Sequence, residues 1–151
     1  MTRFMGNNCW VVNSSPLILL VKIGYVHLIA DLANRVIVPT AVKNEIGVKE
    51  DGKTILELLR DDKRFLFEDD EDVHTALLAW DLGLGETQAI NTAMRKDAER
   101  VVLDDMEARR CAKVMGLSVI GILGLVARAK QLGYIEQAAP IIELCVRPAC
   151  M

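Results

Sequence analysis

Four acidic side chains and one amide lie beside the ends of apolar segments, and they are the first candidates for chemistry. The apolar run Val101–Leu103 is followed at once by two adjacent carboxylates, and the run Trp10–Val12 is followed by an amide. Two further acids occur early in helices expected after a proline and after a glycine. The five candidate residues are Asn13, Glu45, Glu86, Asp104 and Asp105.

Oxygen donors of this kind suit a hard divalent cation. Mg²⁺ and Mn²⁺ prefer carboxylate, carbonyl and water oxygens, and a few carboxylates suffice to hold such an ion against a phosphate. Crowded carboxylates repel one another without a cation, so the cluster makes sense chiefly with metal bound. The residues therefore suggest metal-assisted hydrolysis of a phosphodiester, with water as the nucleophile and Mg²⁺ or Mn²⁺ as the cofactor.

The elements that must position these side chains are short apolar strands alternating with helices. Apolar runs without polar alternation are typical of strands buried on both faces, as in a parallel sheet covered by helices. The pattern predicts an α/β fold with three layers, α/β/α, around a central and mainly parallel sheet. The expected strands are Trp10–Val12, Val36–Val38, Val101–Leu103 and Ser118–Ile120, with a possible further strand at Phe65–Phe67.

The expected helices follow these strands. Pro16–Leu32 should hold two short helices broken near Gly24, and Glu68–Asp72 should be a solvated acidic loop before a weakly amphipathic segment at Val73–Leu82. The other helices are expected at Thr40–Lys49, Thr54–Arg60, Glu86–Asp97, Met106–Met115, Leu123–Leu132 and Glu136–Val146, with a frayed end at Arg147–Met151.

Each candidate also has a local, purely structural interpretation. Asn13, Ser14 and Ser15 before Pro16 suit helix capping, and Glu45 could pair with Lys49 at i+4. Glu86 would be favourable at any helix start, and Asp105 could pair with Arg109. Of the two aspartates we expect one to cap the next helix and the other to face the metal, and the sequence leaves open which does which.

Three cations on the helix after the acidic pair are weaker candidates, for contacts with a substrate phosphate. They are Arg109, Arg110 and Lys113, and a solvated helix face is the commoner reason for such a cluster. His27 and His74 have no partner at ligand or triad spacing, so we assign neither a catalytic role. The four cysteines lack zinc-ligand spacing and are expected to be buried or incidental thiols.

The composition limits the classes of protein to consider. A length of 151 residues suits a single domain, and 52% hydrophobic residues allow a real core. A formal net charge of −3 argues against coating nucleic acid by charge alone. The apolar stretch Ser15–Tyr25 is too short to span a bilayer, and the N-terminal residues lack a signal-peptide pattern, so we expect a cytoplasmic protein with no membrane partner.

Several segments resemble, in order, the PIN domain of VapC-like nucleases. They are "VVNSSPLILLVKIGYVHLIADLANRVIVPTAVKNEI", "LGLGETQAI" and "VVLDDMEARRCAKVMGLSVIGILGLVARAKQLGYI", in the branch whose opening is Asn or Asp followed by Ser or Thr, Ser and Pro. The resemblance covers about residues 11–135, leaves 136–151 outside, and implies one PIN-like domain over residues 1–151. It also implies an acidic pocket that binds Mg²⁺ or Mn²⁺ and cleaves RNA.

Carried over onto this chain, the acidic positions of the family fall on Asn13, Glu45, Glu86 and the Asp104–Asp105 pair. Asn13 and Ser14 would orient a water or the scissile phosphate. The resemblance further implies a toxin of a toxin–antitoxin pair, with an antitoxin protein as a partner, and a homodimer. The amide at Asn13 departs from the acid and brings no negative charge. The alternative function is therefore a catalytically impaired PIN-fold module that acts by binding RNA or protein.

Overall fold

Five parallel strands form one sheet at the centre of the computed structural model, which describes residues 8–146. The strand order is β3-β2-β1-β4-β5, and every neighbouring pair is parallel. The expected parallel sheet is therefore confirmed, and the segment at Phe65 is a true strand within it. The strands are β1 (Cys9–Val12), β2 (Arg35–Pro39), β3 (Phe65–Glu68), β4 (Arg100–Val102) and β5 (Val119–Ile120).

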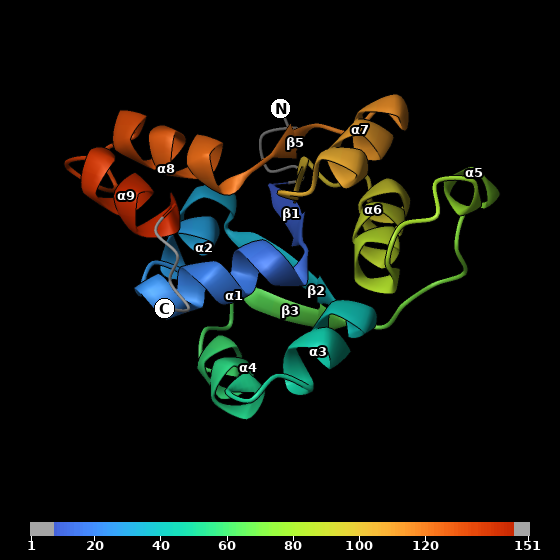
Figure 1. Ribbon diagram of the computed structural model, residues 1–151, viewed down its shortest axis with the longest axis horizontal. Helices are drawn as coiled ribbons and strands as arrows, with labels where there is room; N and C mark the ends of the chain where they lie inside the picture. The colour runs from blue at the N-terminus through green and yellow to red at the C-terminus, as the bar shows by residue number, and fades with distance from the viewer. Residues whose placement is uncertain (1–7, 147–151) are drawn as a thin grey trace.

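Helices cover both faces of the sheet and complete the three-layer architecture (Figure 1). The first half of the chain supplies α1 (Ser14–Ile23), α2 (His27–Ala33), α3 (Thr40–Gly47) and α4 (Gly52–Arg60). The second half supplies α5 (Thr75–Leu78), α6 (Leu84–Lys96), α7 (Met106–Val114), α8 (Ile122–Gln131) and α9 (Ala139–Val146).

Alternation along the strands divides the buried side chains into two cores. Trp10 and Val12 of β1 belong to the core that also holds side chains of α1 to α4, α8 and α9. Cys9 and Val11 belong to the second core, which holds side chains of α5, α6 and α7. Successive side chains of a strand point to opposite faces, so β1 contributes to the packing of helices on both sides of the sheet. Packing on both faces holds the end of this strand, which is followed by Asn13, in a fixed position.

Several boundaries differ from the sequence-based expectations. The helix after Pro39 ends at Gly47, and the weakly amphipathic segment 73–82 contains only the four-residue α5. The last helix begins at Ala139 rather than at Glu136, and the two helices broken near Gly24 are confirmed, because Gly24 ends α1 in the left-handed conformation with φ of 83°. The predicted fraying of Arg147–Met151 lies outside the described residues.

The strand order creates a switch point between β1 and β4. The chain leaves β1 toward β2 and β3 on one side, then returns to place β4 and β5 on the other side. In open parallel sheets, ligands bind outside the carboxyl ends of the strands at such a point. Asn13 follows β1, and the Asp104–Asp105 pair comes shortly after β4. These candidate residues therefore flank the switch point.

No single helix among residues 8–146 is long and apolar enough to cross a membrane. Only α1 and α2 taken together reach the required length and hydropathy, and they are bent by 118° relative to each other.

Candidate active site

A buried amide, Asn13, follows the end of β1. Asn13 is 4% exposed, and its backbone N–H donates to the Val102 carbonyl of the neighbouring strand at 3.2 Å. Asn13 occupies the N-cap position of α1 with extended backbone, as expected, but its side chain makes no capping hydrogen bond to the helix. The Oδ1 atom is buried and has no hydrogen-bond partner among residues 8–146. A buried acceptor without a hydrogen bond lowers the stability of the fold by about 1–3 kcal/mol. A bound ligand that contacts this oxygen would offset that loss.

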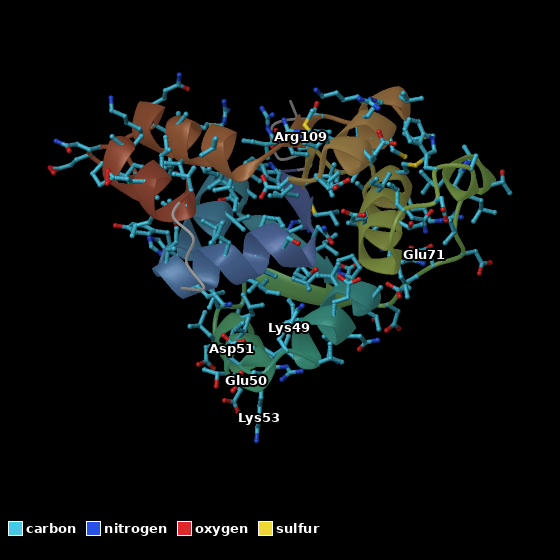
Figure 2. The ribbon with its side chains drawn as sticks, in the orientation of Figure 1. Lys49, Glu50, Asp51, Lys53, Glu71 and Arg109 are labelled. Carbon is cyan, nitrogen blue, oxygen red and sulfur yellow. The ribbon has the colours of Figure 1, made fainter. Side chains whose placement is uncertain are left out.

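Glu45 is the residue at which three distant segments meet. Its Oε1 accepts a hydrogen bond from the Ser14 hydroxyl at 2.7 Å, and its Oε2 accepts one from the Gly85 backbone N–H at 3.1 Å. The side chain therefore joins the starts of α1 and α6 instead of forming the expected pair with Lys49. Figure 2 shows Lys49 at the far end of α3, beside the turn to α4.

Gly85 contacts the candidate residue Glu45, and the sequence-based interpretation missed this position. A Cβ atom at this position would lie 2.3 Å from Glu45 Oε1 and 2.6 Å from its Cδ. No real Cβ contact is that short, so only glycine lets the Glu45 carboxylate rest against the first turn of α6. The signal available in the sequence was the unusual Gly83-Leu84-Gly85 run directly before Glu86, which we had interpreted only as a helix start.

Glu86 lies within electrostatic reach of two other candidates. Burial raises the pKa of its carboxyl, and the negative charge of Asp105 raises that pKa further. A backbone hydrogen bond with Gly83 acts in the opposite direction, and the charge of Glu45 adds a smaller increase. Glu45, Glu86 and Asp105 therefore share one electrostatic environment in which each added negative charge is unfavourable.

The two adjacent aspartates serve different helices. Asp105 is the N-cap of α7, and its Oδ2 accepts a hydrogen bond from the Ala108 backbone N–H at 2.9 Å. Asp104 Oδ1 instead accepts one from the Ile122 backbone N–H at 3.0 Å, at the start of α8. The expectation that one of the pair caps the next helix is therefore confirmed for Asp105, while Asp104 bonds the start of a later helix. Of the two, Asp105 is the one whose charge acts on Glu86.

The three candidate cations lie together on α7. Arg109, Arg110 and Lys113 line a hollow that also includes Asp104 and the first residues of α8. Arg109 Nη1 donates to the Leu103 carbonyl at 3.1 Å, so the expected pair with Asp105 is replaced by a backbone contact. Figure 2 shows Arg109 near β5 and α7.

The donor chemistry around the switch point fits a hard cation, although the acids are not gathered into a ready ligand set. Within residues 8–146, no three His, Cys, Asp or Glu side chains are close enough together to hold a metal ion. The oxygen donors nevertheless include an unpaired buried amide oxygen, and their mutual repulsion is of the kind that a cation relieves. Neutral Asn13, in place of a fourth carboxylate, is one reason that the acidic set is incomplete.

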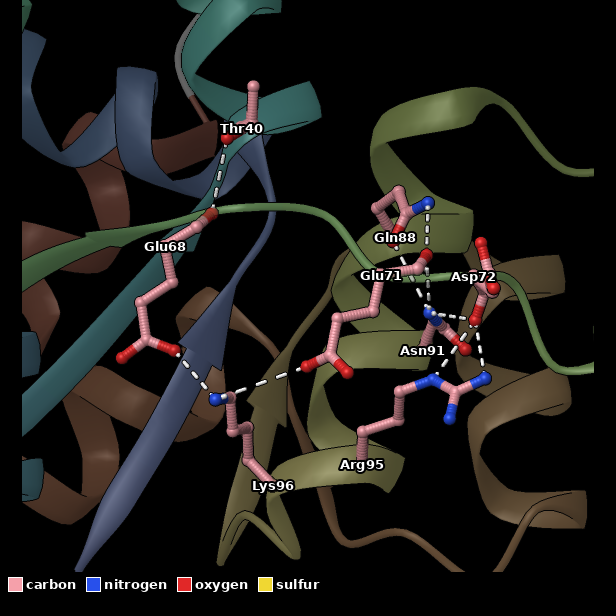
Figure 3. Close-up of polar contacts among 8 residues, drawn as sticks. All are labelled: Thr40, Glu68, Glu71, Asp72, Gln88, Asn91, Arg95 and Lys96. Atoms are coloured by element: carbon pink, nitrogen blue, oxygen red, sulfur yellow. Dashed lines mark hydrogen bonds and ion pairs between the residues drawn. The ribbon is translucent and has the colours of Figure 1, made fainter.

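A loop that we expected to be simply solvated braces the two helices that carry Glu45 and Glu86. Asp70 Oδ1 accepts a hydrogen bond from the Ala41 backbone N–H at 3.2 Å and so caps α3, whose own N-cap residue is a proline. On the other side, Asn91 of α6 donates to the carbonyls of Glu71 and Asp72 (Figure 3).

We call residues 68–74 the strap. Asn91 is fully buried, and its Oδ1 also accepts a hydrogen bond from the His74 backbone N–H at 3.0 Å. Arg95 adds contacts to the Asp72 carbonyl, and Lys96 pairs with Glu68 at 3.1 Å (Figure 3). The sequence signal for this network was two amides three residues apart in one helix, Gln88 and Asn91.

The fold and the acidic edge at its switch point define a PIN-type domain. The family model described as a PIN domain matches residues 9–147, so the chain belongs to the PIN domain family. PIN domains are generally nucleases that act on nucleic acid with divalent metal ions. A search among curated proteins found no match.

Proposed function

We propose that this chain is an endoribonuclease that hydrolyses RNA phosphodiester bonds with Mg²⁺ or Mn²⁺ as its cofactor. One observation carries the proposal. The Glu45 carboxylate is held by Ser14 and Gly85, at the carboxyl edge of the sheet, where the buried oxygen of Asn13 has no partner. A scaffold has no need for a carboxylate fixed at this edge together with a buried oxygen that lacks a partner among the described residues, whereas a cation site does.

Asn13, Glu45, Glu86 and Asp105 would hold the cation. When bound, a divalent cation neutralises phosphate charge and polarises water. The contribution of the chain is to fix these oxygens in place. Ser14 and Gly85 fix both oxygens of Glu45, while the Ala108 backbone N–H fixes one oxygen of Asp105. Preorganised groups need not reorient during the reaction, which lowers its barrier.

The test is cleavage of single-stranded RNA by purified protein in Mn²⁺. Glu45→Gln and Glu86→Gln keep the shape of the side chains but remove a charge. Each should lower kcat/KM by about 100-fold or more, because the stabilisation they support is worth several kcal/mol. Glu50→Gln, at the turn between α3 and α4 (Figure 2), is the matched control and should match the parent protein. Cleavage that persists in the Glu45 and Glu86 variants would contradict the proposal.

Asn13 favours a second candidate function, a PIN-fold module that binds RNA or protein without turnover. The amide supplies an oxygen but no charge, and the acids around it form no ready three-ligand set among the described residues. Asn13→Asp separates the two candidates. A large rise in Mn²⁺-dependent cleavage supports an attenuated nuclease. No cleavage in either protein, with no heat of Mn²⁺ binding in calorimetry, supports the binding module.

We also propose, on the strength of the family resemblance, that the protein acts as a toxin controlled by an antitoxin and forms a homodimer. Light scattering on purified protein tests the dimer, which should give twice the mass of 16.7 kDa. Growth arrest on expression, abolished by Glu45→Gln, tests the toxin role.

A further inference from the structure

Residues of α7, α8 and the edge strand β5 line a hollow that also includes Asp104, one of the five oxygen-bearing candidate residues. Figure 1 shows where these three elements lie. The volume of the hollow is about 690 Å³, within the range of about 300–1,000 Å³ typical of small-molecule sites. Asp104 lies on its border, one residue from Asp105. A polymer bound across the acidic edge would therefore have this hollow next to it.

Positive charge dominates one wall of the hollow. Arg109 and Lys113 are four residues apart on α7, so they lie on the same side of that helix, and Arg110 lies beside them. Arg110 also pairs with Glu107 at 2.5 Å, whereas Lys113 makes no ion pair with any described residue. Among the described residues that line the hollow, Asp104 is the only acid, and its carboxylate accepts the hydrogen bond from Ile122. The hollow is therefore lined by three cations and one carboxylate, and the carboxylate already accepts a hydrogen bond.

Arg109 is the fixed member of this group. One guanidinium nitrogen donates to the Leu103 carbonyl, and the group lies so close to Gly121 that a Cβ there would be 2.3 Å from Nη1. The remaining N–H groups of a guanidinium are arranged as a fork that matches phosphate oxygens. A preordered arginine beside an unpaired lysine is suited to bind an anion rather than to stabilise the fold.

Two exposed apolar side chains also line the hollow, one on each helix: Met106 begins α7, one turn before Arg109, and Leu123 lies on α8. Met106 is 70% exposed and Leu123 is 51% exposed, and both line the hollow. Large apolar side chains left in water next to cations match a ligand that combines a flat apolar part with a negative charge. A nucleotide has this combination, because its base packs on apolar side chains while its phosphate binds cations.

We propose that this hollow binds one nucleotide of single-stranded RNA that flanks the bond to be cut, with its phosphate on Arg109 and Lys113 and its base against Met106 and Leu123. The inference rests on the proposed function for its ligand. The argument for RNA over an acidic peptide is the shared border at Asp104, which places the hollow next to the proposed cleavage position.

The test measures binding without cleavage. A fluorescein-labelled single-stranded RNA of eight nucleotides is titrated with the protein in EDTA, and anisotropy gives Kd at several salt concentrations. Lys113→Ala should raise Kd several-fold and reduce the slope of log K against log salt by about 0.7, the value for one lost contact to a single strand. Arg109→Ala should do the same. Lys53→Ala is the matched control, since Lys53 is exposed and lies at the opposite end of the molecule (Figure 2).

A second probe tests the apolar side chains of the hollow. Met106→Ala should weaken binding of the RNA but leave binding of an abasic strand of the same length unchanged, because the abasic strand has no base to pack. The proposal is overturned if Lys113→Ala and Lys53→Ala give the same Kd and salt slope. It is also overturned if Lys113→Ala weakens binding of a poly-glutamate peptide while RNA binding is unchanged.

The outcomes separate this inference from the catalytic one. If binding in EDTA depends on Lys113 but the parent protein cleaves no RNA, the nucleotide site is supported and the nuclease proposal fails. If the parent cleaves RNA and Lys113→Ala leaves both KM and the salt slope unchanged, the nuclease proposal is supported and the nucleotide site is rejected.

Discussion

Replacing Gly85 with alanine should lower the catalytic activity while changing the stability of the fold only slightly. The added Cβ would lie 2.3 Å from Glu45 Oε1, whereas ordinary contacts begin at about 3.4 Å. The Glu45 carboxylate must therefore retreat by about 1 Å, and the hydrogen bond from the Gly85 N–H is lost or lengthened. A displacement of about 1 Å in a catalytic group can lower the rate by about 100-fold, which is the size of effect we expect in kcat/KM.

The stability of the same variant should change little. Alanine is better than glycine in a helix by about 0.5–1 kcal/mol, which offsets part of the lost hydrogen bond to a half-exposed carboxylate. We expect the free energy of unfolding to stay within about 2 kcal/mol of the parent value. Urea denaturation gives this number, RNA cleavage in Mn²⁺ gives kcat/KM, and calorimetry gives the Mn²⁺ affinity, which should fall with activity.

Gly47→Ala is the matched control, because Gly47 lies on the helix that carries Glu45. A Cβ there would meet Leu56 Cδ1 at 3.7 Å, an ordinary contact, so activity should be unchanged. If Gly85→Ala folds and keeps the kcat/KM and Mn²⁺ affinity of the parent, the position of Glu45 against α6 is not important for function, and our reasoning about this contact is refuted.

Three further variants test the contacts around the site. Ser14→Ala removes the 2.7 Å hydrogen bond to Glu45. It should lower kcat/KM about tenfold and the free energy of unfolding by about 1 kcal/mol. An unchanged kcat/KM would show that Gly85 alone holds the carboxylate. Asn91→Ala removes one of the donors to each of two strap carbonyls and leaves the His74 N–H without its acceptor. It should cost about 2–3 kcal/mol in urea denaturation, and a loss under about 1 kcal/mol would mean that water replaces the amide. Asp70→Ala removes the cap of α3 and should cost about 1 kcal/mol in the same assay, whereas Asp69→Ala, one residue away and exposed, should cost nothing; equal losses would contradict the cap.

The fold could be predicted from the sequence because its signals are local. The run Val101–Leu103 is apolar without alternation, since β4 is covered on both faces, and Val101 and Val102 belong to different cores. Polar residues directly after such runs had to lie at the carboxyl edge of the sheet. The placement of Asn13 and Asp105 near the switch point therefore followed from the strand pattern alone.

The details of the site could not be predicted, because they depend on contacts between distant positions. Ser14 and Glu45 are 31 residues apart, and Glu45 and Gly85 are 40 residues apart. The residues next to Gly85 in the sequence do not indicate that a carboxylate contacts it. The different contacts of the two aspartates could not be predicted for a related reason. Adjacent residues beyond a strand end point in different directions, so each carboxylate bonds the start of a different helix.

The strap has a consequence for how freely this part of the chain can change. Asn91 and Arg95 anchor it through the carbonyl oxygens of residues 71 and 72, a group that every amino acid possesses. The path of the strap therefore depends largely on side chains of α6 rather than on the side chains of the strap itself. Positions such as Asp69, whose side chain takes part in no anchoring contact, are therefore open to grafted sequences that would alter the rim of the molecule while Glu45 and Glu86 keep their places.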